Sequence, residues 1–236
     1  MYEALVITPV KDSLNTTIET IRSIGKSDGK FHYAIYNDFS SEETTQSLKS
    51  MSLDYNFELV NLSEITTTPS PNYRLVLQLA QKKALELGIP LIIIESDVEV
   101  NQTTISELIR QSKSLVNCGM VAAITKDMDG KINFPYLNFK ATKKEIIQTR
   151  HSLSFCCTLL TSTFLNQYDF KSLSAEKHWY DVTISRKSIQ LGLKNYLLVT
   201  QSVVHKPHSS RPWKQLKYTN PVKYYYQKLV GRLDRI

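Results

Sequence analysis

Residues 91–100, LIIIESDVEV, constrain the fold more than any other stretch of the sequence. Four large aliphatic residues follow the tripeptide Gly-Ile-Pro, which is typical of a buried central strand in an α/β sheet. The run then ends in Glu95, Asp97 and Glu99. Three carboxylates that leave a buried strand together repel one another and lose hydration, so they favour a divalent cation as a partner. The alternative is a strand that leaves the core and ends in solvated acids.

Strands and helices are predicted to alternate along the first half of the chain. The apolar patterns predict strands at 3–10, 32–36, 57–62, 91–98 and 120–125, and helices at 13–24, 41–51, 72–87 and 103–117. Ser13 and Ser40 or Ser41 are candidate N-caps, and Gly88 is a candidate helix stop. This order predicts an α/β fold with a mainly parallel central sheet and helices on both faces.

The second half of the chain is less regular. Its patterns predict strands at 155–160, 196–199 and 202–205, helices at 161–168 and 181–191, and a turn at 127–131. No linker rich in Gly, Ser or Pro separates the two halves. Because 236 residues suit one α/β domain, we expect a single domain over 1–210 and a separate tail over 211–236.

Several features favour a protein of the reducing cytoplasm. No apolar run approaches the roughly 18 residues that span a bilayer. The first residues, MYEALVITPV, lack the basic segment of a signal peptide and are typical of a first strand. Cys118, Cys156 and Cys157 offer neither a disulfide framework nor metal-ligand spacing. We expect Cys156 and Cys157 to be small core residues.

Positive charge is concentrated at the C-terminal end. Residues 211–236 contain seven Lys and Arg against one Asp, which leaves the rest of this +7 chain close to neutral. A nucleic-acid groove needs basic residues spread along the fold, so we expect no nucleic-acid partner. The tail also contains Trp213 and four tyrosines, and this mixture favours an anionic membrane surface at the inner face of the membrane. The alternative is a basic helix that packs on the domain through its tyrosines.

Five motifs in order over residues 4–210 resemble those of family 2 glycosyltransferases of the GT-A fold. They are VITPVKD at 6–12, YNDFSS at 36–41, ESDVEV at 95–100, YDVTISRKSIQLGLK at 180–194 and VVHKPHSS at 203–210. The resemblance implies a Rossmann-like GT-A domain. It also implies polysaccharide biosynthesis, by inverting transfer of a sugar from a nucleotide-diphosphate sugar to a hydroxyl of a glycan or lipid-linked acceptor.

The resemblance assigns a set of residues to the nucleotide-sugar donor. These residues are Pro9, Val10, Asp12, Asp38, Asn72, Arg74, Glu95 and Ser96. Asp38 would accept a hydrogen bond from the nucleobase, and Arg74 would meet a phosphate oxygen through its planar guanidinium. Each also has a plain alternative, a turn aspartate before a helix and a solvated helix arginine.

The resemblance also assigns a metal site and a catalytic base. Asp97, Glu99 and His205 would bind Mn²⁺ or Mg²⁺, and Asp97 belongs to both carboxylate pairs with the family's D-x-D spacing. The alternative for His205 is a histidine that ends an edge strand. Asp181 would face the acceptor as the general base.

Four positions depart from the family pattern. Glu95 stands where the D-x-D motif usually has its first Asp. Phe39 stands where glycine is usual, so we expect this turn to avoid the left-handed backbone that glycine permits. Tyr180 and Thr183 replace two acids of the acceptor-facing motif, which leaves Asp181 alone for acid–base chemistry. These losses favour a second reading, a carbohydrate- or protein-binding module without catalysis.

A sugar nucleotidyltransferase is the other alternative with this sheet and these carboxylates. Such an enzyme usually has a glycine-rich basic loop after the first strand. Here that loop is PVKDSLN at 9–15, which contains no glycine. The sequence therefore favours glycosyl transfer, in which a cation bound by hard oxygen ligands stabilises the charge on the diphosphate leaving group.

Overall fold

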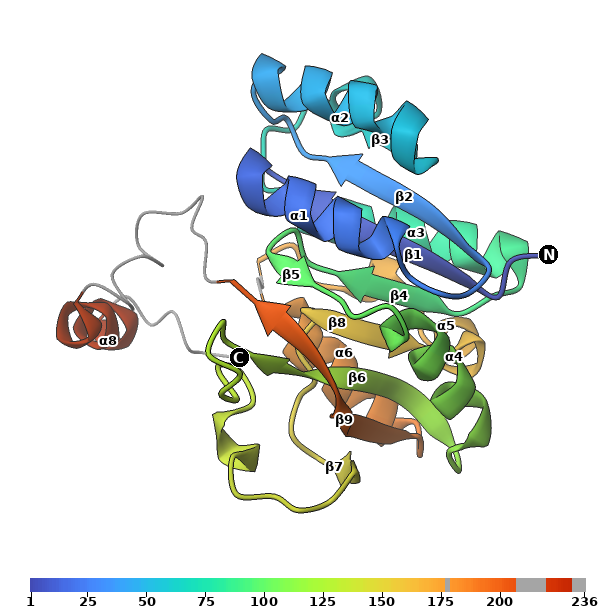
Figure 1. Cartoon of the computed structure of the whole chain (residues 1–236), viewed down its shortest axis with the longest axis vertical. Helices are drawn as coiled ribbons and strands as arrows, with labels where there is room; N and C mark the ends of the chain where they lie inside the picture. Colours follow the sequence, from blue (N-terminus) through green and yellow to red (C-terminus); the bar gives the residue numbers. More distant parts are fainter. Residues whose placement is uncertain (177–178, 207–219, 231–236) are drawn as a thin grey trace. The chain divides into compact units, whose positions relative to one another are not determined.

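A computed structural model describes residues 1–176, 179–206 and 220–230 (Figure 1). One compact unit spans Met1–Lys206, and the residues from Pro207 onward form a second unit. The tail predicted over 211–236 is described only at 220–230, which contains the helix α8 (Pro221–Val230). Among the described residues, no helix is both long and apolar enough to cross a membrane.

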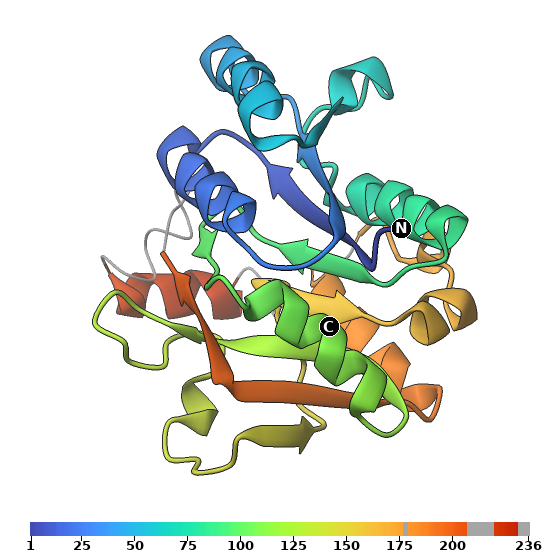
Figure 2. The same cartoon turned by 45° about the vertical axis from the view of Figure 1, so that its right-hand side comes forward.

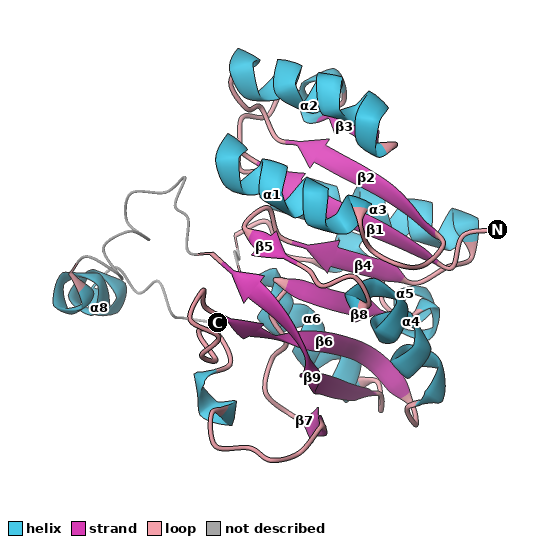
Figure 3. Ribbon diagram, viewed as in Figure 1, coloured by secondary structure: helices cyan, strands magenta, loops and turns pink. Residues whose placement is uncertain are grey.

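The first unit combines one sheet with six α-helices among its described residues (Figure 3). The strands are β1 (Ala4–Val10), β2 (Phe31–Asn37), β3 (Glu58–Asn61), β4 (Leu91–Ile94), β5 (Val98–Glu99), β6 (Cys118–Lys126), β7 (Ile146–Thr149), β8 (Cys157–Leu160) and β9 (Lys194–His205). The helices are α1 (Leu14–Gly25), α2 (Glu42–Tyr55), α3 (Tyr73–Leu87), α4 (Thr104–Ser114), α5 (Ser162–Gln167) and α6 (Tyr180–Gln190).

The sheet is mainly parallel, as predicted. Its strand order is β3-β2-β1-β4-β8-β6-β9-β5, and β7 pairs with β9. The strands β3, β2, β1 and β4 run parallel to one another, and β6 runs parallel to β9. Between these blocks, β8 is antiparallel to both β4 and β6. The carboxyl ends of β1, β2 and β4 therefore meet at one edge of the sheet.

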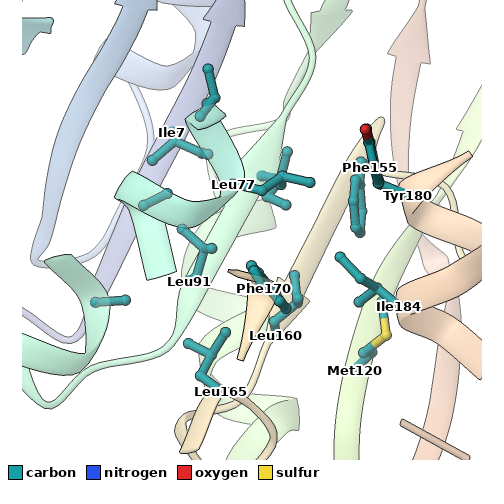
Figure 4. Packing of buried hydrophobic residues seen from close by; sticks show 14 of the residues in the cluster. Ile7, Leu77, Leu91, Met120, Phe155, Leu160, Leu165, Phe170, Tyr180 and Ile184 are labelled. Atoms are coloured by element: carbon teal, nitrogen blue, oxygen red, sulfur yellow. The ribbon is translucent and has the colours of Figure 1, made fainter. Parts of the chain in front are cut away.

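Helices cover both faces, which the turned view of Figure 2 shows as layers. Buried residues of α1, α2 and α4 pack on one face, and those of α3, α5 and α6 pack on the other. Successive side chains of β4 point to opposite faces of the sheet, and both faces are buried, so its apolar run is unbroken. Leu91 and Ile93 join the core under α3, and Ile92 and Ile94 join the core on the other face. Figure 4 shows the α3 side, where Leu77 and Leu91 lie in the same buried cluster as Phe170.

Two strand predictions are wrong in their extent. The strand predicted at 91–98 ends at Ile94, because residues 95–97 form a turn before β5 pairs with β9. The two strands predicted at 196–199 and 202–205 are one strand, β9. Ala123 of β6 pairs with Leu198, and the next residue, Ile124, pairs with Ser202. This register shift leaves residues 199–201 of β9 without a partner in β6, and β9 continues along β6 beyond them.

The predicted helix signals differ in their outcome. Ser41 caps α2, because its hydroxyl accepts a hydrogen bond from the Thr44 amide. Gly88 ends α3 with a left-handed backbone at φ 68°. Ser13 precedes α1 but does not cap it with its side chain. Its own backbone is left-handed, at φ 56°.

Candidate functional site

The predicted donor residues lie on turns that follow β1 and β2. Pro9 and Val10 end β1 and pair in register with Tyr36 and Asn37 of β2. The side chain of Val10 is buried in the core on the α1 side, so at this position only the backbone can face a ligand. Ligands of open α/β sheets bind outside the carboxyl ends of the strands, which is where these two turns lie.

Asp12 joins the two turns. Its carboxylate accepts from the Ser41 amide at 2.8 Å and pairs with Lys11 at 3.2 Å, while its own amide donates to the Ser40 hydroxyl at 2.9 Å. Partial burial alone would raise the pKa of Asp12, but the Ser41 and Lys11 contacts outweigh it and lower the pKa. Asp12 therefore stays ionised and holds the turn after β2 in place.

The expectation for the turn at Phe39 is wrong. Phe39 has φ 55°, so it adopts the left-handed backbone without being a glycine. This costs about 1–2 kcal/mol, and neighbouring contacts hold the conformation. The Ser40 amide donates to Asn37, the Ser40 hydroxyl accepts from Asp12, and the Phe39 ring packs on the core under α3.

Asp38 is buried and binds residues of its own chain. Its carboxylate accepts from the Asn72 amide and side chain and from the Ser70 hydroxyl, each at 2.8 Å. Asn72 also donates to the Thr68 carbonyl at 2.9 Å. These contacts fix the loop that leads into α3 beside the turn after β2.

Arg74, on the first turn of α3, reaches across to the segment before α6. It donates to the Leu173 carbonyl at 3.0 Å, and its charge acts on the phenol of Tyr180. Arg74 thus connects the region assigned to the donor with the region assigned to the acceptor.

Glu95, Cys156 and His205 form a group of potential metal-binding side chains among the described residues. One ligand atom from each lies within 4.8 Å of the other two. Three strands bring them together: Glu95 follows β4, Cys156 precedes β8 and His205 ends β9. The Glu95 amide also donates to the Cys156 carbonyl at 3.2 Å.

Asp97 lies against this group through His205. The Asp97 Oδ2 to His205 Nε2 distance is 3.4 Å, and both side chains are buried. Ser96 is buried in the same turn. The His205 Nδ1 lies 3.1 Å from the Phe134 carbonyl, which favours a proton on Nδ1 and directs Nε2 toward the group.

Burial and the neighbouring side chains act on the pKa of His205 in opposite directions. Burial alone would lower the pKa of His205, but the contacts with Cys156 and Asp97 outweigh it and raise the pKa. The contacts with Cys156 and Asp97 therefore favour the protonated form of His205.

Glu99 does not belong to the metal-binding group of Glu95, Cys156 and His205. It forms an ion pair with Lys206, which also pairs with Glu19 at 2.8 Å. Among the described residues, the group of three does not include Glu99. The arrangement therefore favours Glu95 and Asp97, rather than Asp97 and Glu99, as the pair at the site.

Tyr73 connects the metal-binding group with Asp181. The phenol oxygen of Tyr73 is buried and has no hydrogen-bond partner within the described part of the chain. Burial raises the pKa of Tyr73, and the charges of Glu95, Asp181 and Cys156 raise it further. The rings of Tyr73 and Tyr180 lie 6.2 Å apart, so the start of α6, which includes Asp181, is next to Tyr73.

Cys156 lies at the site, although its sequence context predicts a small core residue. Cys157 is a buried core residue, as expected, but the Cys156 thiol lies 3.5 Å from the Glu95 carboxylate. Cys156 stands next to Glu95 because β8 runs antiparallel to β4 with Cys157 opposite Ile94. Spacing along the chain gives no sign of this pairing. A cysteine immediately before an apolar strand is the only signal it leaves.

Comparisons with known proteins identify the fold. No family model matches the sequence, and a search of curated proteins finds no match. Among solved structures, residues 1–349 of S. aureus TarS align with a TM-score of 0.65 and 17% identity over 91% of this chain and 62% of that chain. GalNAc-T7 aligns with a TM-score of 0.64 and 13% identity over 100% of this chain and 52% of that one.

A third similar structure is the mannosyltransferase PcManGT from Pyrobaculum calidifontis. It aligns with a TM-score of 0.66 and 12% identity over 97% of this chain and 64% of that chain. The GalNAc-T7 structure contains UDP, GalNAc and Mn²⁺, and the PcManGT structure contains GDP-Man and Mn²⁺. The present chain spans only about half to two-thirds of these three chains. With its mixed α/β sheet and its helices on both faces, this chain has the GT-A glycosyltransferase fold.

Proposed function

We propose that this protein is a glycosyltransferase that uses a nucleotide-diphosphate sugar and a divalent cation. The observation that carries the proposal is the convergence of Glu95, Asp97 and His205 at the carboxyl ends of the strands of a GT-A fold. Two solved neighbours contain a nucleotide or nucleotide sugar together with Mn²⁺. Oxygen and imidazole ligands in this group fit Mn²⁺ or Mg²⁺.

The donor lies along the turns after β1 and β2 and at the start of α3 in this proposal. Asp12 holds the turn that faces the nucleotide, and Asp38 orders the loop before α3 through Asn72. We assign the donors of Arg74 that do not bond to Leu173 to the diphosphate. Glu95, Asp97 and His205 would hold the cation, which would supply positive charge to stabilise the departing diphosphate.

Asp181 takes the proton of the attacking hydroxyl. A hydroxyl is a weak nucleophile at neutral pH, and a carboxylate within hydrogen-bond reach activates it. Asp181 and Glu95 act on the same phenol, so a base and a metal ligand belong to one region. A base on the acceptor side and charge stabilisation on the donor side suit direct displacement with inversion.

We propose a glycan or lipid-linked acceptor in polysaccharide biosynthesis.

Release of a nucleoside diphosphate tests this function without knowledge of the acceptor. The full chain is incubated with UDP- and GDP-sugars and Mn²⁺, and free UDP or GDP is measured with time. We expect slow hydrolysis of one donor class that stops when the cation is chelated. Hydrolysis of neither class, with no binding of either, would support the alternative of a non-catalytic module.

We also propose that the C-terminal segment contacts an anionic membrane. In α8, Val222, Tyr225 and Tyr226 are exposed and lie at i, i+3 and i+4, on one side of the helix, beside the exposed Lys223. An exposed apolar and aromatic stripe next to basic residues is typical of a helix at a membrane surface. Most of the basic residues of 211–236 lie outside the described residues.

Truncation after Ser210 is expected to release the protein from vesicles that contain anionic lipid. Each basic residue near such a surface contributes about 1 kcal/mol, and salt screens this attraction. Co-sedimentation across a salt series measures the effect. A variant with V222S, Y225S and Y226S retains the charge and should lose only the salt-resistant part of the binding. Equal pelleting of the full chain and the truncated chain would exclude the tether.

A further inference from the structure

Cys156 is a metal-binding side chain that the proposed mechanism does not use. Its thiol is buried, and it lies with the Glu95 carboxylate and the His205 imidazole in one group whose ligand atoms are all within 4.8 Å of one another. The three residues come from different strands, so the group is built by the fold and not by local sequence.

Two distances, one inside the group and one between His205 and the neighbouring Asp97, match the spacing of two ligands on a tetrahedral ion. Zn–S bonds are about 2.3 Å long and Zn–O and Zn–N bonds about 2.0 Å, so a sulfur and an oxygen ligand at the tetrahedral angle lie about 3.5 Å apart, and a nitrogen and an oxygen ligand about 3.3 Å. The Cys156 Sγ to Glu95 Oε2 distance is 3.5 Å, and the His205 Nε2 to Asp97 Oδ2 distance is 3.4 Å.

A second observation points to a ligand at this place. The buried phenol oxygen of Tyr73 has no hydrogen-bond partner among the residues that the structure describes, and it lies close enough to Glu95 and Cys156 to feel their charges. A buried donor without a partner is destabilising. A bound ligand or an ion-bound water beside the group would satisfy it.

We propose that the Cys156 thiolate binds the same cation as Glu95 and His205, which makes the site selective for a borderline-soft ion such as Zn²⁺ or Co²⁺ over Mg²⁺. Thiolate ligands favour such ions, whereas a site of carboxylates and water suits Mg²⁺. This inference deepens the proposed function, because it concerns the metal of the same site.

The thiol loses its proton when the ion binds. The Cys156 thiol donates a hydrogen bond to the Glu95 carboxylate at 3.5 Å. A coordinating cation deprotonates a thiol outright, and the proton goes to solvent. The thiol needs no neighbouring base for this step.

Cobalt titration tests the assignment directly. Co²⁺ is added to the full chain without nucleotide, and the near-ultraviolet absorption is recorded, since a thiolate ligand gives a sulfur-to-cobalt charge-transfer band that oxygen and nitrogen ligands do not. We expect this band in the wild-type protein and in the matched controls C118A and C157A. We expect its loss in C156S, with Co²⁺ binding weakened by about tenfold or more.

Metal selectivity gives a second readout. A site with an imidazole ligand can bind Zn²⁺ more tightly than Mg²⁺ even without a thiolate, so the informative quantity is how the ratio of the two affinities changes between wild type and C156S. We expect the substitution to lower Zn²⁺ affinity much more than Mg²⁺ affinity, as measured by thermal shift of proteins whose folding is first verified by circular dichroism.

The outcomes separate this inference from the proposed function. Co²⁺ binding without a charge-transfer band in the wild type would overturn the Cys156 assignment and leave a metal site of oxygen and nitrogen ligands. A band that persists in C156S would overturn it as well. A band that depends on Cys156, in a protein that neither binds nor hydrolyses any nucleotide sugar, would support the metal site and contradict the glycosyltransferase proposal.

Discussion

Asp97→Asn is expected to reduce sugar transfer, or donor hydrolysis, by about 10³-fold or more. The cation supplies several kcal/mol of charge stabilisation to the departing diphosphate, and each 1.36 kcal/mol or so corresponds to a factor of ten in rate. Asparagine keeps the shape of the side chain but removes the negative charge that faces His205 at 3.4 Å. The rate is measured with saturating Mn²⁺ and donor, beside a melting curve that verifies folding.

Glu95→Gln and Glu99→Gln serve as a matched pair for the same site. Glu95 belongs to the metal-binding group, whereas Glu99 pairs with Lys206. We expect Glu95→Gln to weaken the Mn²⁺-dependent thermal shift strongly. Glu99→Gln should leave the shift nearly unchanged and cost at most about 1 kcal/mol of stability. A larger effect at Glu99 would show that Asp97 and Glu99 form the true pair.

Asp181→Asn is expected to lower kcat by about 10²–10⁴-fold, the usual contribution of a positioned general base. Binding of the nucleotide should barely change, because Asp181 faces the acceptor in this account. Asp181 also lies in the first turn of α6, where a negative charge stabilises the helix by about 0.3–1 kcal/mol. A small drop in melting temperature is therefore expected and does not explain a large loss of rate.

Asp169→Asn is the matched control for Asp181→Asn. Asp169 is exposed and caps the short helix at Phe170–Ser172, a role that asparagine preserves. The Asp169→Asn variant should retain the wild-type rate of sugar transfer. If Asp181→Asn loses nucleotide binding and keeps its turnover, Asp181 belongs to the donor side and not to the acceptor side.

The first half of the fold could be predicted from the sequence because its signals are local. Apolar runs, a capping serine at Ser41 and a helix stop at Gly88 place each element within a few residues of its observed bounds. Their alternation gives parallel strands with helices on both faces. The same local signals place Glu95 and Asp97 after a buried strand.

What could not be predicted depends on contacts distant in sequence. The insertion of β8 between β4 and β6 is a choice of hydrogen-bond partners in the sheet, and it alone brings Cys156 beside Glu95. The left-handed turn at Phe39 is held by contacts with Asp12 and Asn37, which override the local preference for glycine. The partner of Glu99 is Lys206, which lies 107 residues later in the sequence.

Calorimetric titration of the wild-type protein with UDP and with GDP, each with and without Mn²⁺, tests the central claim most directly. The claim is that a cation held at Glu95, Asp97 and His205 binds the diphosphate of a nucleotide sugar. We predict that one of the two nucleotides binds with Mn²⁺ present and binds at least about tenfold more weakly without it, a difference of about 1.4 kcal/mol. Failure of both nucleotides to bind, or equal affinity with and without the cation, would contradict the account.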